Sequence, residues 1–161
     1  KKKLLNTIIT EDGNVNKKLE GKNANLILHK SGIKVDKIIK LIVFEDSCYS
    51  DVVVKEIFMP ILPIVRVKSF DEALEIAIEI EQGCKHTSSM FSESIEHLNR
   101  AAKKMQTSIF VKNGPSYLGI GFDEEGDTTF TIANVTGEGS TTAQNFGRKR
   151  RCILTTGFSI R

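Results

Sequence analysis

Residues 55–67 read KEIFMPILPIVRV, a run that predicts the end of a short helix followed directly by a buried strand. Because proline disrupts a helix, we expect Pro60 to end the helix and residues 61–67 to form the strand. Glu56 and Phe58 then lie at the junction. A carboxylate there can accept two hydrogen bonds from the vicinal hydroxyls of a ribose, and a ring can cover an apolar or π-faced group. A solvated glutamate and a core phenylalanine are the alternative interpretation of the same pair.

Helix-like and strand-like apolar patterns alternate along the rest of the chain, which indicates an α/β fold. No internal repeat, low-complexity tract or linker interrupts this alternation. The predicted strands are residues 40–44, 61–67, 88–91, 108–111, 128–132 and 152–156.

Four helices are predicted from their capping residues. The expected N-terminal caps, in chain order, are Asn23, Ser50 or Asp51, Ser69 and Ser92. Gly32 would end the first helix and Gly83 the third, in which Glu72 completes a capping box. The second helix would lead to Phe58. The fourth has an apolar face formed by Ile95, Leu98, Ala102 and Met105. Residues 114–127 are rich in glycine and acidic side chains, and we expect them to form a loop.

The composition is ordinary for one soluble globular domain, since 40% of the 161 residues are hydrophobic and 27% are charged. No run of about 18 apolar residues occurs, so we expect no membrane span. The apolar stretch after the lysines at 1–3 is short and too polar for a secretory signal. Cys48, Cys84 and Cys152 are odd in number and widely spaced. This spacing favours reduced thiols in the cytosol over disulfides or a zinc site, so no metal is expected. The net charge of +3 permits an anionic ligand without requiring nucleic acid.

Two clusters could carry further chemistry. Cys84 and His86 could pair as nucleophile and base, but neighbours so close in sequence rarely reach the required geometry. We therefore expect the His86 imidazole to line a pocket. Residues 148–151, RKRR, form the only dense basic run. Alternate side chains of a strand point to opposite faces, and no aromatic residue intervenes. An edge strand that faces solvent or a partner subunit is therefore favoured over a nucleic-acid contact.

Three loops are weaker candidates. Residues 119–121, GIG, begin like a dinucleotide fingerprint, but the third glycine is missing and no helix pattern follows. Residues 136–141, TGEGST, could contact a phosphate, but a plain turn is favoured. The acidic residues at 123–127 lack the spacing of a calcium loop, so we expect a solvated tip.

Longer blocks of the sequence resemble the CoA-acylating aldehyde dehydrogenases. The nearest group is that of the acetaldehyde, propionaldehyde and butyraldehyde enzymes of bacterial ethanolamine and propanediol utilisation. The matching blocks are MPILPIVRV at 59–67, Gly83 with His86 and Thr87, TSIFVKNGPSY at 107–117, TTFTI at 128–132, TGEG at 136–139 and RKRRC at 148–152. The resemblance covers nearly the whole chain.

The resemblance implies part of an aldehyde dehydrogenase catalytic domain, a mostly parallel sheet with flanking helices, over residues 1–145. Residues 146–161 would form an oligomerisation strand that joins the sheet of a partner subunit in a homo-oligomer. The implied cofactor is NAD, with NADP as the alternative, and coenzyme A is the cosubstrate of a small aldehyde. The implied cofactor-binding residues are Glu56 and Phe58, and the implied substrate-pocket residues are His86, Thr87, Asn113 and Ser116.

The resemblance also implies that the reaction's nucleophile is not in this chain. In the family a cysteine thiolate adds to the aldehyde, hydride passes to NAD, and CoA takes the acyl group from the thioester. That cysteine precedes the matched region, so we expect a fragment without catalytic residues and inactive alone. Its parent enzyme would be cytoplasmic, with a bacterial microcompartment as a second location. The alternative is a non-catalytic interaction or oligomerisation module derived from the same family. We expect neither nucleic acid nor a membrane as a partner.

Overall fold

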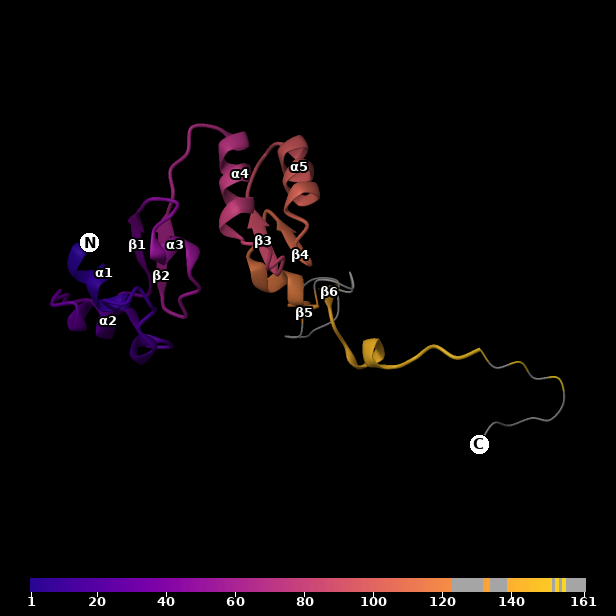
Figure 1. Ribbon diagram of the computed structural model, residues 1–161, viewed down its shortest axis with the longest axis horizontal. Coiled ribbons are helices and arrows are strands. Elements are labelled where there is room, and N and C mark those ends of the chain that lie inside the picture. The colour runs from indigo at the N-terminus through magenta and orange to yellow at the C-terminus, as the bar shows by residue number, and fades with distance from the viewer. Residues whose placement is uncertain (123–131, 134–138, 152, 154, 156–161) are drawn as a thin grey trace. The chain divides into compact units, whose positions relative to one another are not determined.

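The computed structural model describes residues 1–122, 132–133, 139–151, 153 and 155 (Figure 1). The chain divides into two compact units, Lys1–Gly83 and Cys84–Arg161. The acidic tip at 123–127, most of the predicted strand 128–132, the loop 136–138 and most of the predicted strand 152–156 lie outside the described residues. The boundary expected between residues 145 and 146 therefore stays a prediction. In the described part of the chain, no helix is long and apolar enough to cross a bilayer.

The first unit contains a small parallel β-pair and several helical segments. Its strands are β1 (Ile42–Glu45) and β2 (Ile61–Ile64), which pair in parallel with Ile42 opposite Ile61. Parallel strands need a crossover connection, and the segment between them contains α3. The helical elements are α1 (Lys2–Ile8), η1 (Lys17–Leu19), α2 (Ala24–Lys30), α3 (Asp51–Val54) and α4 (Phe70–Ile80).

The two faces of this β-pair differ in exposure. The core of the unit consists of Leu4, Ile8, Leu19, Ile27, Val52 and Ile61. Ile42 and Phe44 pack against this core from one face of the pair. On the opposite face Val43, Leu62 and Ile64 are 44–50% exposed. Parallel sheets are normally covered on both faces, and among the described residues of the first unit this second face is an exposed apolar surface.

The capping rules located two helices correctly. The Asn23 side chain accepts a hydrogen bond from Leu26 N, and α2 ends before Gly32, whose φ is +69°. Ser69 Oγ accepts a hydrogen bond from Glu72 N at 3.2 Å, as the capping box predicts. The reciprocal bond differs, because Glu72 Oε2 accepts from Lys68 N at 2.7 Å. In a standard capping box Glu72 would accept from the backbone N–H of the cap residue Ser69, but here it accepts from the residue before the cap.

The second predicted helix ends earlier than expected. α3 stops at Val54, and Lys55 is already extended, with ψ 142°. The run Val52–Val54 is β-branched, and such side chains lose rotamer freedom in a helix. The prediction that Glu56 and Phe58 lie at a helix end is therefore wrong. Both lie in the extended connection between α3 and β2.

The second unit contains a second parallel pair, β3 (Thr87–Met90) and β4 (Ile109–Lys112), joined by α5 (Ile95–Met105). The cap of α5 is Ser94, whose Oγ accepts from His97 N, and not Ser92 as predicted. The Ser92 hydroxyl instead accepts from Ser94 N. The other described elements are η2 (Ser116–Ile120), β5 (Ile132–Ala133), β6 (Gly139–Ser140) and η3 (Ala143–Phe146).

A short 3₁₀ helix covers one face of the β3–β4 pair. This element, η2, lies in the segment that the sequence predicts as a plain loop. Gly119 approaches β4 so closely that an added Cβ would lie 2.1 Å from Ile109 Cγ2. Ile109, Val111, Thr87 and Ser89 share this face, because directly opposed residues of a pair point to the same side. The missing side chain at Gly119 therefore permits η2 to seal Ile109, which is buried.

Candidate functional site

Glu56 carries a carboxylate that is not used by the fold. Its neighbour Lys55 is fixed, because Nζ lies 2.5 Å from Asp51 Oδ1 and also donates to the carbonyl of Gly13. Glu56 itself is exposed, and its side chain forms no hydrogen bond or ion pair with any residue that the structure describes. This exposure is also expected if Glu56 is simply a solvated surface glutamate, the alternative interpretation given above. The local surroundings decide what this free carboxylate can do.

Glu56 lies on the wall of an open hollow of about 720 Å³. The other lining residues are Thr10, Asp12, Asn14, Val15, Asn16, Lys17, Lys18, Glu20 and Lys55. The hollow therefore combines carboxylates with ammonium groups. The size lies within the range of ligand sites, about 300–1,000 Å³. A ligand with both hydroxyl donors and anionic acceptors would match this wall chemically.

Phe58 is 60% exposed, so the interpretation as a core residue is wrong. Its ring lines a different hollow, of about 710 Å³, together with Ile38, Ile57, Met59 and Pro60. The two hollows draw on the same two segments of chain, because Glu20 and Glu56 line the first, whereas Gly21 and Phe58 line the second. Gly21 N donates to the carbonyl of Phe58 at 2.8 Å, which joins these two segments. The structure thus brings Glu56 and Phe58 to one extended segment but not to one cavity.

His86 and Thr87 stand at the start of β3 in the second unit. His86 is exposed, and its Nδ1 is hydrogen-bonded to Thr87 Oγ1 over 2.8 Å. Thr87 and Ser89 point to the same side of the strand. Ser89 Oγ is hydrogen-bonded to Ser116 Oγ over 3.0 Å. Three of the four predicted pocket residues therefore belong to one polar strip between β3 and η2.

Asn113 is used locally by the fold. Its Oδ1 accepts from Ser92 N at 2.7 Å, and its Nδ2 donates to Ser92 O at 3.0 Å. Its φ of +56° is the left-handed conformation, which asparagine tolerates better than most residues. Both ends of the amide are occupied, so Asn113 joins the carboxyl ends of β3 and β4. Contact with a ligand would have to use its remaining lone pair and N–H.

Other residues singled out from the sequence lie apart from these features. Cys48 is half-buried and Cys84 is exposed, and neither forms a disulfide. Of the other two histidines, His29 is exposed on α2 and His97 is half-buried on α5. Arg148, Lys149, Arg150 and Arg151 are exposed. Within the described ranges, no group of three or more His, Cys, Asp or Glu side chains is arranged to hold a metal ion.

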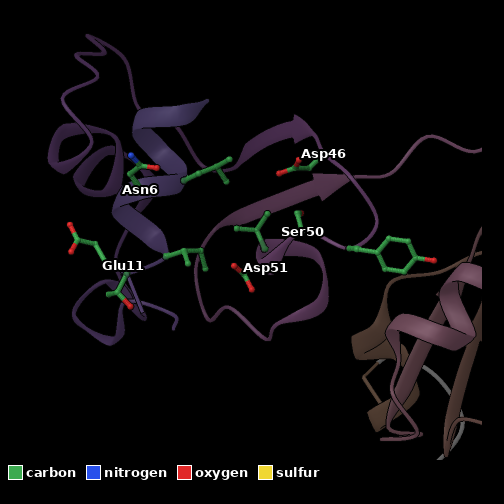
Figure 2. Close-up of a pocket in the computed structure, with 10 residues that line it drawn as sticks. Asn6, Glu11, Asp46, Ser50 and Asp51 are labelled. Atoms are coloured by element: carbon green, nitrogen blue, oxygen red, sulfur yellow. The ribbon is translucent and has the colours of Figure 1, made fainter. Parts of the chain in front are cut away.

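A third hollow, of about 580 Å³, lies between α1 and the segment that leads into α3 (Figure 2). Asn6, Glu11, Asp46, Ser50 and Asp51 line it, and Figure 2 shows their side chains around the opening. None of the predicted site residues lines this hollow. Asp46 Oδ2 and Ser50 Oγ are buried without a hydrogen-bond partner in the described structure.

Two ion pairs at this end of β1 lower carboxylate pKa values. Lys1 Nζ lies 2.8 Å from Asp46 Oδ1, and this hydrogen bond is the main reason that the pKa of Asp46 falls below 3.8. Arg66 Nη2 lies 3.1 Å from Glu45 Oε2, and the hydrogen bonds from Arg66 lower the pKa of Glu45 below its ordinary 4.5. Both groups are therefore more acidic in the folded state than in the unfolded chain.

We expect the first unit to lose stability in acid for this reason. A carboxylate with a lowered folded pKa contributes its full stabilisation above its unfolded pKa, and that contribution disappears as the pH falls through the folded pKa. The free energy of unfolding should therefore decrease below the ordinary values of 3.8 and 4.5. Urea unfolding across this pH range should show a weaker pH dependence for Asp46→Asn combined with Glu45→Gln. An equal pH dependence in the variant and the wild type would contradict this assignment.

The sequence interpretation missed Lys17 and Lys18, which share the hollow of Glu56. They belong to η1, and the local signal for η1 is Asn16, whose side chain accepts a hydrogen bond from Lys18 N. That signal could have indicated the turn. It could not have indicated that the turn lies beside Glu56, because their proximity depends on tertiary packing.

The chain resembles known proteins over nearly its whole length. The model of the aldehyde dehydrogenase family matches residues 11–122. The propanal dehydrogenase (CoA-propanoylating) of Salmonella typhimurium is 49% identical over 158 residues, which are 98% of this chain and 34% of that protein. The chain thus spans about a third of the length of this curated relative.

Two solved structures have a similar fold, each with a TM-score of 0.88. One is an engineered glycolyl-CoA reductase comprising 8 mutations with bound NADP+, 45% identical, for which the match covers 95% of this chain and 35% of that chain. The other is a propionaldehyde dehydrogenase from the fucose utilisation bacterial microcompartment of Clostridium phytofermentans. It is 43% identical, and the match covers 99% of this chain and 37% of that chain.

Proposed function

The chain belongs to the aldehyde dehydrogenase family, and on that premise we propose that it supplies one part of a CoA-acylating aldehyde dehydrogenase. The reaction converts a short-chain aldehyde and coenzyme A to an acyl-CoA. Two observations support this assignment: the name of the Salmonella typhimurium relative and its 49% identity. NAD is the proposed hydride acceptor and NADP the alternative, since the engineered relative holds NADP+.

The observation that carries the proposal is the free carboxylate of Glu56 on the wall of a hollow. A nicotinamide cofactor fits there because the two hydroxyls of a ribose are donors and an ionised carboxylate is a pure acceptor. The bound nicotinamide ring supplies the chemistry of hydride acceptance. Glu56 orients the sugar, and the exposed ring of Phe58, which lines a separate hollow on the same extended segment, offers an apolar surface to another part of the cofactor. Both side chains position the cofactor without taking part in bond formation.

The residues of the second unit are proposed to form part of the substrate wall. His86, Thr87 and Ser116 belong to the polar strip described above, and hydroxyl and imidazole groups can orient an aldehyde oxygen or a polar part of CoA. Asn113 fixes the ends of the two strands that bear the strip. We assign the strip to binding and not to catalysis.

We further propose that the nucleophilic cysteine is none of Cys48, Cys84 and Cys152. Cys84 is exposed and only two residues from His86, and neighbours so close in sequence rarely reach the geometry of a nucleophile and its base. The 161 residues alone are therefore expected to form no NADH from aldehyde, CoA and NAD. Absorbance of NADH over time measures this, and a variant with all three cysteines changed to serine is the matched control. Turnover that the serine variant abolishes would contradict the proposal.

A second candidate is a non-catalytic interaction module of the same family, in a homo-oligomer or with another enzyme of a microcompartment. The exposed apolar face of β1 and β2, with Val43, Leu62 and Ile64, favours it, because such a face is normally covered. The oligomerisation strand proposed at residues 146–161 would also serve such a module, because it would join the sheet of a partner subunit. A module without a cofactor role would leave the resonances around Glu56 unchanged when a nicotinamide nucleoside is added.

A further inference from the structure

We propose that Thr87 is a positioning residue for His86: its hydroxyl donates to Nδ1 of the imidazole, keeps the ring proton on Nε2, and so presents an outward N–H to the carbonyl oxygen of a ligand. This assignment rests on the proposed function, because it takes the polar strip between β3 and η2 as part of the substrate wall. The ligand class is a carbonyl compound, an aldehyde or an acyl thioester, whose oxygen accepts hydrogen bonds and cannot donate them.

The bond between these two neighbouring side chains requires a departure from regular strand geometry. Successive side chains of a strand point to opposite faces, which would separate the imidazole from the hydroxyl. Nδ1 of His86 and Oγ1 of Thr87 are nevertheless 2.8 Å apart. The departure occurs at Lys85, whose φ of +50° lies in the left-handed region that few residues other than glycine adopt. Because β3 begins only at Thr87, His86 lies between this turn and the strand.

The left-handed turn at Lys85 is held by three hydrogen bonds. Ser108 N donates to the carbonyl of Lys85 at 2.9 Å, and Ile109 N donates to the carbonyl of His86 at 3.2 Å. Lys85 Nζ donates to Gln106 Oε1 at 3.0 Å, and Gln106 itself has a φ of +53°. An unfavourable backbone conformation persists only where its surroundings determine it, and such positions cluster at functional sites. The turn therefore fixes the backbone of His86 at the amino end of the β3–β4 pair.

The burial of the hydroxyl indicates which group donates. Thr87 is half-buried, and among the described residues its Oγ1 has no hydrogen-bond partner other than Nδ1 of His86. If Nδ1 carried the proton, the half-buried hydroxyl would lack an acceptor in the described part of the chain, and an unmade hydrogen bond costs free energy. If the hydroxyl donates, only Nε2 of the exposed ring is left for water or a ligand. The second arrangement makes the accessible nitrogen a donor.

This tautomer assigns both ring nitrogens of His86. Nδ1 accepts from Thr87, and Nε2–H faces outward as a donor of fixed direction. A neutral ring in this state has no lone pair left to take a proton from a thiol such as that of Cys84. The imidazole is therefore suited to orient a carbonyl oxygen, in agreement with the assignment of the strip to binding.

The test measures the tautomer of His86 directly in the 161-residue chain labelled with ¹⁵N. The chemical shifts of the ring nitrogens distinguish the protonated nitrogen from the bare one, and at about pH 9 imidazoles are neutral. We expect Nε2–H to dominate in the wild type. Thr87→Val keeps the shape of the side chain and should lower the ratio of Nε2–H to Nδ1–H about fivefold, as expected for the loss of one hydrogen bond. Thr87→Ser retains a hydroxyl and should restore the ratio of the wild type.

Ser88→Ala is the matched control, since it removes the hydroxyl of the next residue, which is bonded to Thr107 Oγ1 and not to His86. It should leave the ratio unchanged, and an equal decrease in this control would overturn the proposal. A ratio that rises in Thr87→Val would show that the hydroxyl accepts from Nδ1–H, and an unchanged ratio would show that the bond selects no tautomer. Either result overturns the proposal. So does a wild type in which Nδ1–H dominates, a result that needs no variant to fold.

The measurement of the tautomer uses no ligand, so its outcome is independent of the proposed function. Titration of the same sample with propionamide, an unreactive carbonyl compound, then tests the ligand class. A shift of the Nε2–H resonance in the wild type that Thr87→Val weakens supports the proposal. If the tautomer is as expected but propionamide leaves this resonance unchanged, the carbonyl ligand and the substrate wall are contradicted, whereas the positioning of His86 by Thr87 stands.

Discussion

Glu56→Gln is expected to weaken NADH binding by at least about tenfold, since a hydrogen bond to a charged group contributes about 1.5–3 kcal/mol. Glutamine has the same size, but it replaces one acceptor oxygen with an NH₂ donor that faces the ribose hydroxyls. Glu56 has no partner among the described residues, so its replacement should not disturb the fold. NMR titration of the chain with NADH measures the change, and amide spectra without ligand show whether the fold is retained.

Glu20→Gln is the matched control, because Glu20 lines the same hollow and carries the same charge. NADH is an anion, so removal of a nearby negative charge should leave its affinity unchanged or raise it. The two variants are thus expected to act in opposite directions or with very different strength. Tighter NADH binding by Glu56→Gln would indicate that Glu56 only repels the ligand, and the assignment of a ribose contact would be wrong.

Gly119→Ala is expected to destabilise the second unit by about 1–3 kcal/mol, the usual cost of inserting a methyl group into a packed site. The added Cβ would lie 2.1 Å from Ile109 Cγ2, so η2 or β4 must move. The expected result is a loss of protection of the β4 amides in hydrogen exchange, which reports the stability of this unit by itself. Because η2 carries Ser116, its hydrogen bond to Ser89 should weaken in the same variant.

A double-mutant cycle identifies the cause. In an Ile109→Ala background the clashing methyl group is absent, so the alanine at position 119 should cost much less than in the wild type. Ile109→Ala alone removes a buried side chain and will also destabilise the unit, which is why the comparison uses differences. If the cost of Gly119→Ala is the same in both backgrounds, the close approach to Ile109 is not its source.

Local capping chemistry explains why some helices could be predicted from the sequence and others could not. Asn23 and Ser69 cap through bonds to residues three positions ahead, so the pattern is visible in a short window. The end of α3 depended on competition between a predicted cap and a β-branched run. η2 could not be predicted because it is stabilised by contact with β4, and its sequence otherwise has the composition of a loop.

In the candidate site, too, some residues could be predicted from the sequence and others only from tertiary contacts. The sequence and the resemblance predict Glu56 as a site residue, and the family assignment is confirmed by the match over residues 11–122. The lysines of η1 remained hidden, since the hydrogen bond between Gly21 and Phe58 joins two segments far apart in sequence. The blocks that carry the resemblance begin at residue 59, and η1 precedes all of them. Residues that act through tertiary proximity therefore required the structure.

The central claim is that the carboxylate of Glu56 recognises a sugar diol. The most direct measurement is an NMR titration of the wild-type chain with nicotinamide riboside and with its 2′,3′-dideoxy analogue, which lacks both hydroxyls. We expect the riboside to bind at least about tenfold more tightly and to shift the amides of the segment around Glu56. Equal affinity for the two ligands, or shifts that leave this segment unaffected, would contradict it.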